Sequence, residues 1–328
     1  MAYTRVSTHQ PPLFSGRQES GKLVHSLWFE SGLNKKMADQ LNAESVLGPL
    51  GWRHCKNVIP KHQIEAVKAE LSEWMAVKGL PKKGFIFNGI DGQAKQFSGS
   101  ITDFQLSLQK SLPILPSVYK LALSQEINQV LEISAGWSES ELSPIHNIRV
   151  KYPSKYGVNS FTTVPWHQDY GATDPRQSNL CIVTAWIPLT PTDSRNGGIE
   201  IIPRSTILGW LGHRRGERGP EVQHEIMRKV LNGRNDLKSV KLKTALGDLI
   251  LFDQYTLHRS LINSSNKIRW SMDMRYISAG SESGRPGMWH RNPAVGECVD
   301  AEVMSLIQQR HDSMASPQVE IRKRVDSV

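Results

Sequence analysis

Apolar residues recur at helical spacing in the first third of the chain. Between residues 61 and 78 they fall three to four positions apart, at Ile64, Val67, Leu71 and Trp74. This spacing predicts an amphipathic helix that begins after Pro60. A second apolar stripe predicts helical structure over residues 117–136. We therefore expect a first third that is rich in helices, with one short strand at residues 52–59.

The second half of the chain has a different pattern, made of short apolar or alternating stretches bounded by turns. A period of two is typical of strands that bury one face. Because turn residues rather than helices separate these stretches, they predict a barrel or a jelly roll. The expected strands cover residues 148–152, 181–189, 198–202, 249–252 and 268–277.

Composition narrows the class of protein. The 328 residues are 38% hydrophobic and 22% charged, which is enough apolar content for a packed core. The longest apolar stretches are far shorter than the roughly 20 residues that cross a bilayer, and the N-terminus lacks the pattern of a signal peptide. Three widely spaced cysteines are typical of reduced thiols. We therefore expect a cytoplasmic protein without a membrane partner, as a monomer or homodimer.

The net charge of +9 is concentrated in one segment. Residues 204–243 contain ten Lys and Arg against four Asp and Glu. Such a segment can be a solvated insertion, a rim that attracts an anionic substrate, or a nucleic-acid surface. The chain has no zinc-finger spacing and no basic-aromatic signature of an RNA-binding module. We therefore predict that nucleic acid is not a partner, and the first two interpretations stay open.

His167 is the only histidine that has an acidic residue, Asp169, two positions later. In an extended segment these side chains project to the same side, so an imidazole and a carboxylate can reach one point. They would supply two of the three ligands of the facial triad used for non-haem Fe(II). A pair of this kind is also expected by chance in a chain with eleven histidines, so the pair alone is a weak signal.

Two later residues strengthen this hypothesis. His258 follows the predicted buried strand at residues 249–252, from which it could complete the triad. Arg269 comes eleven residues after His258, on a strand whose alternate residues share one face: Arg269, Ser271, Asp273 and Arg275. A guanidinium that points into a barrel can hold a carboxylate through two parallel hydrogen bonds. A polar edge strand that faces solvent is the alternative interpretation of this pattern.

The order of these motifs resembles the phytanoyl-CoA dioxygenase family of Fe(II)- and 2-oxoglutarate-dependent oxygenases. The resemblance covers residues 50–278 and is strongest over 146–277. The chain departs from the family at residues 204–206, where Arg-Ser-Thr replaces Gly-Ser-His and the iron site is left intact. The matching positions are His167-Gln168-Asp169, Trp186, Asn196-Gly197-Gly198, Pro203, Gly247-Asp248, His258-Arg259-Ser260, Asn263 and Arg269.

The resemblance implies a mainly β fold with N-terminal helices, of the α+β class. After an N-terminal arm at residues 1–45, a single oxygenase domain would cover residues 46–328. Within it, a helical buttress (46–145) would support a double-stranded β-helix of the jelly-roll or cupin type (146–278). Residues 279–328 would form a C-terminal extension.

The resemblance also implies the roles of individual residues. The distal carboxylate of 2-oxoglutarate would bind Arg269, with Ser260 as a second contact, and Trp186 would line the same pocket. Tyr170 and Trp166, which flank the metal motif, are candidates for substrate contact. The iron ligands would be His167, Asp169 and His258.

The expected function is oxidation of a small organic molecule, with hydroxylation as the default outcome. Fe(II), 2-oxoglutarate and O2 would take part, and succinate and CO2 would be released. Secondary metabolites and acyl or amino-acid derivatives are the expected substrates, and an anionic substrate is an open option. The alternatives are a protein or nucleic-acid hydroxylase with the same chemistry, or a desaturase, an epoxidase or a rearrangement enzyme.

Overall fold

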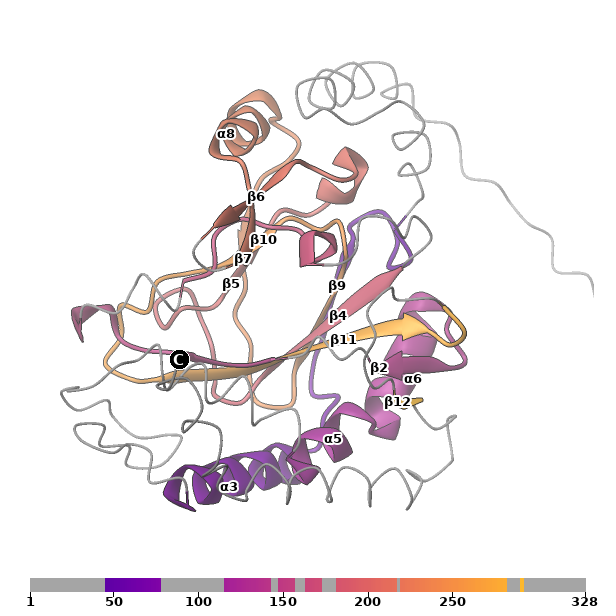
Figure 1. Cartoon of the computed structure of the whole chain (residues 1–328), viewed down its shortest axis with the longest axis vertical. Coiled ribbons are helices and arrows are strands. Elements are labelled where there is room, and N and C mark those ends of the chain that lie inside the picture. Colours follow the sequence, from indigo (N-terminus) through magenta and orange to yellow (C-terminus); the bar gives the residue numbers. More distant parts are fainter. Residues whose placement is uncertain are drawn as a thin grey trace, which may run out of the picture.

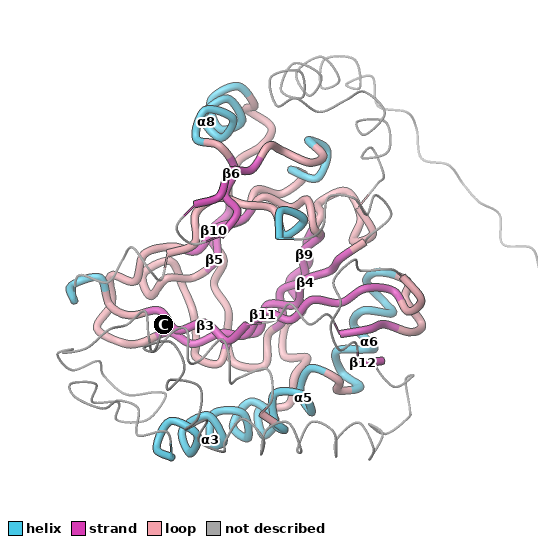
Figure 2. Tube along the Cα trace, viewed as in Figure 1, coloured by secondary structure: helices cyan, strands magenta, loops and turns pink. Residues whose placement is uncertain are grey.

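The strands form two main antiparallel sheets (Figures 1 and 2). The computed structural model describes residues 45–77, 115–142, 147–156, 163–172, 181–216, 219–281 and 290–291. The large sheet has the order β1-β9-β4-β11-β2-β12, and β3 also pairs with β11. Its strands are β1 (Trp52–Cys55), β2 (Ser140–Leu142), β3 (Asn147–Lys151), β4 (Ile182–Pro188), β9 (Leu249–Asp253), β11 (Arg269–Ser278) and β12 (His290–Arg291). The small sheet, in the order β10-β5-β8, contains β5 (Ile199–Ile201), β8 (Val240–Lys241) and β10 (His258–Ser260).

Three helices cover the outer face of the large sheet. Their apolar residues pack against outward-facing residues of β3, β4, β9 and β11 in the largest core cluster. Tyr276 of β11 also donates a hydrogen bond of 2.7 Å to the carbonyl of Ala122. Figure 1 shows the helices one after another along this layer: α3 (Lys61–Val77), α5 (Pro116–Ala122) and α6 (Gln125–Ala135).

The inner face of the large sheet is divided into an apolar half and a polar half. On β4 and β9 it is mainly apolar, apart from Thr184, and it packs against the small sheet through Trp186, Ile250, Phe252, Ile199 and Ile201. On β3 and β11 it is charged or polar, because alternate residues of a strand share a face. This polar half contains Arg149, Lys151, Arg269, Ser271, Asp273 and Arg275.

The basic segment at residues 204–243 folds into a cap that has its own core. The cap contains η4 (Ser205–Leu208), the hairpin of β6 (His213–Gly216) and β7 (Gly219–Val222), and helix α8 (His224–Gly233). It is therefore a packed part of the fold rather than a loose insertion, although Arg214 and Arg215 are exposed on it. Its core cluster contains Trp166, Ile202, Leu208, Leu211, Val222, Ile226, Met227, Val230, Leu237 and Leu257.

The predicted helix at residues 61–78 and the five predicted strands of the second half are confirmed to within a residue or two. The helical stretch at 117–136 is instead two helices, because the chain breaks at Leu123 and Ser124, which cap α5 and α6. The strand predicted at 52–59 ends at Cys55, because Asn57 has a positive φ of 52° and the chain turns there.

Some predictions fall on residues that the structure does not describe. These are the N-terminal arm up to residue 44, part of the helical buttress at 78–114 and most of the extension at 279–328. Among the residues that are described, no helix has the length and hydropathy that crossing a membrane requires.

Candidate metal centre

His167, Asp169 and His258 lie close together because backbone pairing places them opposite or beside one another. His258 begins β10, and an isolated antiparallel bridge pairs it with His167. The amide of His167 donates to the carbonyl of His258 at 3.0 Å, and the reverse bond is 3.1 Å. Asp169 begins the short helix η3 (Asp169–Ala172), directly after this bridge. The two histidines are therefore held opposite each other, and the carboxylate is placed beside them.

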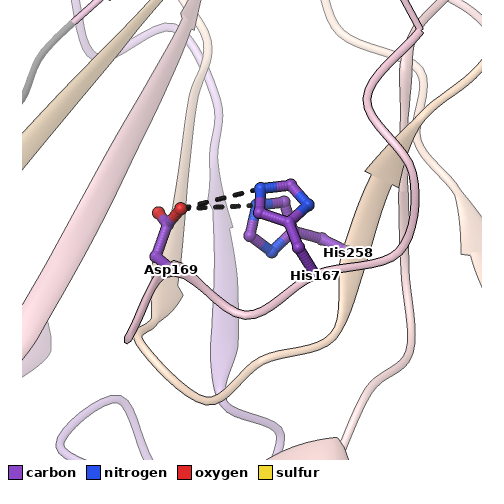
Figure 3. A group of neighbouring side chains, drawn as sticks. All are labelled: His167, Asp169 and His258. Atoms are coloured by element: carbon purple, nitrogen blue, oxygen red, sulfur yellow. Dashed lines mark ion pairs between the residues drawn. The ribbon is translucent and has the colours of Figure 1, made fainter. Parts of the chain in front are cut away.

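The three side chains have the spacing of a metal site (Figure 3). Oδ1 of Asp169 lies 3.7 Å from Nε2 of His167 and 3.9 Å from Nε2 of His258. The imidazole centroids are 4.1 Å apart. An ion with ligand bonds of about 2.1 Å spans donor atoms up to roughly 4 Å apart. The three donors therefore fit a single divalent ion.

The protonation of both histidines also suits metal binding. Nδ1 of His167 lies 2.9 Å from the carbonyl of Pro165, and Nδ1 of His258 lies 2.9 Å from the carbonyl of Thr256. A carbonyl can only accept, so each Nδ1 carries the proton and each Nε2 keeps its lone pair for a metal. Burial lowers the pKa of His167 to about 3 and also lowers the pKa of His258, so both rings stay neutral.

Asp169 is held by two residues of the large sheet. Nη2 of Arg275 donates to Oδ1 at 2.6 Å, and the hydroxyl of Thr184 donates to Oδ2. Thr184 and Arg275 are cross-strand partners on β4 and β11, so they reach the carboxylate from one row of the sheet. Burial by itself would raise the pKa of Asp169, but the charge of Arg275 and its hydrogen bond to the carboxylate outweigh this effect and hold that pKa well below its usual range. The carboxylate is therefore ionised and fixed before any metal binds.

Gln168, between the two motif ligands, points the other way and anchors the metal loop to the cap. Its amide nitrogen donates to the carbonyls of Gly209 (2.7 Å) and Tyr255 (2.8 Å), and its amide oxygen accepts from the backbone of Leu211 at 2.8 Å. The backbone N–H of Gln168 donates to Nε2 of His213 at 3.0 Å. These buried bonds hold the loop against the cap through Gln168. The neighbouring ligands His167 and Asp169 point away from the cap, toward the metal position.

Arg269 lies on the same inner face as Arg275, at the opposite end of β11. Its side chain is buried, and its guanidinium donates to the carbonyl of Gly197 and the hydroxyl of Ser271. The guanidinium carbon lies 5.8 Å from the centre of the Trp186 ring. Burial lowers the pKa of Arg269 to about 10, and the negative charge of nearby Asp273 opposes this effect only in part. The alternative interpretation of this strand as a solvent-facing edge is wrong, because β11 is paired on both sides.

Trp186 lies near Arg269, and Ser260 bonds to Lys151, the cross-strand partner of Arg269. Ser260 follows His258 by two residues on β10, and its hydroxyl accepts hydrogen bonds of 2.7 Å from Lys151 Nζ and from the backbone of Val164. Trp186 is buried in the core cluster between the sheets. Their roles as contacts of 2-oxoglutarate stay predictions.

The two candidates for substrate contact have protein partners. Tyr170 packs against the rings of Trp210 and Tyr255, with centroids 5.2 and 5.1 Å away. Trp166 belongs to the core of the cap, and the guanidinium of Arg259 lies 4.7 Å from its ring centre. A contact of either ring with substrate also stays a prediction.

Several residues of the site escaped the sequence analysis. Thr184 and Lys151 lie on strands that the sequence predicted, but only the register shows that they face the site. Arg275 was placed on the correct face of the strand, but no contact with a metal ligand was predicted for it, whereas it contacts the metal ligand Asp169 directly. Arg149 pairs with Asp273 on the same wall at 2.5 Å. The alternation of β3 was the signal that could have placed Arg149 and Lys151 on one face, whereas β4 has no such alternation.

The fold and the site together define a class of protein. Two imidazoles and one carboxylate that leave coordination positions open form the facial triad of non-haem Fe(II) oxygenases. The family model described as "Phytanoyl-CoA dioxygenase (PhyH)" matches residues 51–271, which is more than half of the chain. The chain belongs to the phytanoyl-CoA dioxygenase family, so the resemblance seen in the sequence is confirmed, and the protein is an oxidoreductase.

Solved structures share the fold at low sequence identity. The non-haem monooxygenase ThoJ has a TM-score of 0.53 at 16% identity, over 85% of this chain and 95% of ThoJ. EctD from S. alaskensis, solved with 2-oxoglutarate and 5-hydroxyectoine, has a TM-score of 0.51 at 14% identity, over 78% and 80%. The epimerase SnoN, in complex with Fe3+, alpha-ketoglutarate and nogalamycin RO, has a TM-score of 0.50 at 17% identity, over 78% and 89%. A comparison with curated proteins found no match.

Proposed function

We propose that this protein is an Fe(II)- and 2-oxoglutarate-dependent dioxygenase that oxidises a small organic molecule. Hydroxylation is the outcome we propose, with secondary metabolites and acyl or amino-acid derivatives as the substrate classes. Two structural neighbours were solved with 2-oxoglutarate or alpha-ketoglutarate, and these proteins share the fold. We also propose that the two sheets are the halves of a double-stranded β-helix, which the packing of their inner faces in one core cluster supports.

One observation carries the proposal: the guanidinium of Arg269 is buried, and its hydrogen bonds go to neutral groups. A buried guanidinium normally has a carboxylate partner, because an uncompensated buried charge is costly. The hydrogen bonds of Arg269 go to a carbonyl and a hydroxyl, both neutral. It lies near Trp186 on the polar half of the inner face, on the same strand as Arg275, which contacts the metal ligand Asp169. A dicarboxylate that reaches from the metal to Arg269 would supply the missing partner.

The residues of this chain have distinct tasks in such a reaction. Bound Fe(II) and 2-oxoglutarate together supply the power to activate O2 and oxidise a C–H bond, with decarboxylation to succinate. His167, Asp169 and His258 hold the metal, and Arg275 and Thr184 keep the carboxylate ligand in place. Arg269 orients the cosubstrate through its distal carboxylate. The protein thereby fixes the position at which the target bond must lie.

Replacing Arg269 tests the proposal. Loss of a buried charge-assisted pair costs on the order of 2–5 kcal/mol, which corresponds to about 30-fold or more in affinity. We expect Arg269→Ala to raise the dissociation constant of 2-oxoglutarate by about that factor. Arg269→Lys should recover only part of the affinity, because an ammonium lacks the planar fork. The measurement is anaerobic titration of the Fe(II) protein, followed by the metal-to-ligand charge-transfer band.

Arg195→Ala is a matched control, because Arg195 is an exposed arginine of the neighbouring turn that pairs only with Asp193 among the ion pairs described. Fe(II) binding should survive in both variants, since the three ligands are untouched. If Arg269→Ala bound 2-oxoglutarate within about twofold of the parent, the choice of cosubstrate would be wrong. Product analysis then separates hydroxylation from desaturation, epoxidation or rearrangement.

The cap offers a second, smaller prediction. Arg214 on β6 already pairs with Glu221, and Arg215 is exposed beside it. A nucleic-acid surface that used both residues would lose nearly two units of its salt-dependence slope when they are neutralised. We expect Arg214→Gln/Arg215→Gln to leave a weak affinity for single- and double-stranded DNA and RNA unchanged, as measured by fluorescence anisotropy at several salt concentrations. Tight, salt-sensitive binding by the parent would revive the nucleic-acid alternative.

A further inference from the structure

Of the three arginines on the polar half of the inner face, Arg149 alone is partly open to solvent. Arg269 and Arg275 are buried, whereas 29% of the Arg149 side chain is exposed. Among the metal ligands, His167 is also partly open, with 15% of its side chain exposed. A molecule that enters the site from solvent therefore meets Arg149 on the large sheet and His167 in the metal loop.

The charge of Arg149 acts on both ends of the site. Arg149 is the cross-strand partner of Ser271, which is two residues from Arg269 along β11. Burial is the main cause of the low pKa values of His167 and His258, and the charge of Arg149 lowers both further. Burial also lowers the pKa of Arg269, and Arg149 adds to that effect. The guanidinium is therefore close to the metal position and to the Arg269 end alike.

The protein uses only one edge of this guanidinium. Nε of Arg149 donates to Oδ2 of Asp273 at 2.5 Å, and neither Nη group makes a hydrogen bond within the described part of the chain. Four of the five N–H donors of an arginine are on its Nη groups, and a pair of them matches the two oxygens of a carboxylate. Asp273 therefore fixes the orientation of Arg149 and leaves the Nη edge available for a second carboxylate.

The charges of the loaded site favour one more anion. Against the three arginines of the polar half, the carboxylates described beside them are Asp169 and Asp273. Asp273 is shared, since it bonds to Arg149 and also acts on Arg269. Fe(II) and the doubly charged 2-oxoglutarate cancel each other, so binding both leaves the excess positive charge unchanged. A positive excess in a partly buried site favours an anionic ligand, because water screens it poorly.

We propose that Arg149 binds a carboxylate of the primary substrate, so that the substrates of this protein are small organic acids. This inference rests on the proposed function, because it assumes that Fe(II) and 2-oxoglutarate occupy the metal position and the Arg269 end. A carboxylate held at Arg149 would fix one end of the substrate and thereby place a C–H bond near the metal. Arg149 is thus a residue that determines specificity and is separate from the metal ligands.

The test uses acetate as the probe and acetamide as its neutral analogue of the same size. Mn(II) in place of Fe(II) shortens the proton relaxation times of small molecules that bind close to it, so weak binding can be measured by NMR. In the protein loaded with Mn(II) and 2-oxoglutarate, the relaxation enhancement should be at least about threefold larger for acetate, since acetamide cannot form a charge-assisted pair. Arg149→Met should reduce the enhancement of acetate to the level of acetamide.

Arg214→Met is the matched control. Arg214 also donates through Nε to a carboxylate, that of Glu221 at 2.7 Å, and is partly exposed, but it lies on the cap. This variant should leave the enhancement of acetate unchanged. If Arg149→Met kept the enhancement of the parent, acetate would be binding to the metal or to another group, and the inference would be overturned.

A second substitution serves if Arg149→Met does not fold. Arg149→Lys keeps a charge beside Asp273 but lacks the paired Nη donors. It should lower the enhancement of acetate, and an enhancement equal to that of the parent would overturn the inference.

The outcomes also separate this inference from the function on which it rests. A parent protein that binds Mn(II) but shows no affinity for 2-oxoglutarate in calorimetry would contradict the proposed function. A parent that binds both, yet relaxes acetate no more than acetamide, would contradict only the role of Arg149. A loss of 2-oxoglutarate affinity in Arg149→Met as large as that in Arg269→Ala would assign Arg149 to the cosubstrate and would also overturn the inference.

Discussion

Replacing His167 by alanine is expected to abolish metal-dependent activity and to leave the fold almost unchanged. Loss of an outer-shell partner alone typically lowers metal affinity 10–100-fold, so loss of a ligand should exceed the upper end of that range. The His167 ring has its hydrogen bond to a local carbonyl and is partly exposed, so its removal leaves no buried charge. Anaerobic titration with Fe(II) and 2-oxoglutarate should show no charge-transfer band, and succinate release should fall to background.

The control for this prediction is a histidine outside the site. His54 lies on the edge strand β1 and pairs with Asp248 at 2.8 Å, so His54→Ala should keep both the band and succinate release. A band that persists at parent strength in His167→Ala would mean that the metal binds elsewhere.

Replacing Arg275 by methionine is expected to destabilise the protein without metal more than any other single change of charge at the site. Arg275 and Asp169 are 5% and 1% exposed, so this is a fully buried pair. Removing one partner of such a pair costs about 3–5 kcal/mol, because the other charge stays buried without compensation. Urea unfolding should show this loss. Saturating Co(II) should restore part of it, because the metal then compensates the charge of Asp169.

Arg149→Met is the comparison for this second prediction. Arg149 pairs with Asp273 on the same wall, but 29% of its side chain is exposed, so water screens the pair and the loss of stability should be smaller. Equal losses in the two variants, or no recovery of Arg275→Met with Co(II), would show that Arg275 supports packing rather than the metal ligand.

Much of the fold could be predicted from the sequence because alternation and helical spacing are local signals. The period-two pattern predicted β3 and β11, and the helical spacing of Ile64, Val67 and Leu71 predicted α3. The break between α5 and α6 was missed because both halves continue one apolar stripe, and only the caps at Leu123 and Ser124 divide them.

The candidate site shows where such reasoning ends. A spacing of two along the chain placed His167 and Asp169 together, since strand geometry fixes that relation without any tertiary contact. The contact of Arg275 with Asp169 depends on how β11, β4 and η3 meet in space, and the sequence contains no signal for that register. Lys151 was missed for the same reason, because its partner Arg269 is more than 100 residues away.

The anchor made by Gln168 has a consequence for how proteins of this design can diverge or be engineered. In the cap, the side chain of Gln168 bonds only to main-chain groups, the carbonyl of Gly209 and the amide of Leu211. Most residue exchanges in the cap therefore leave this tether intact, provided that Gly209, whose φ is 60°, and His213, which accepts from the backbone of Gln168, are kept. A change in the number of residues between Ser205 and Leu211 would shift the main-chain groups out of reach. A library that recodes the cap at constant length around Gly209 and His213 should therefore keep its iron, whereas insertions and deletions in residues 205–211 should lose it.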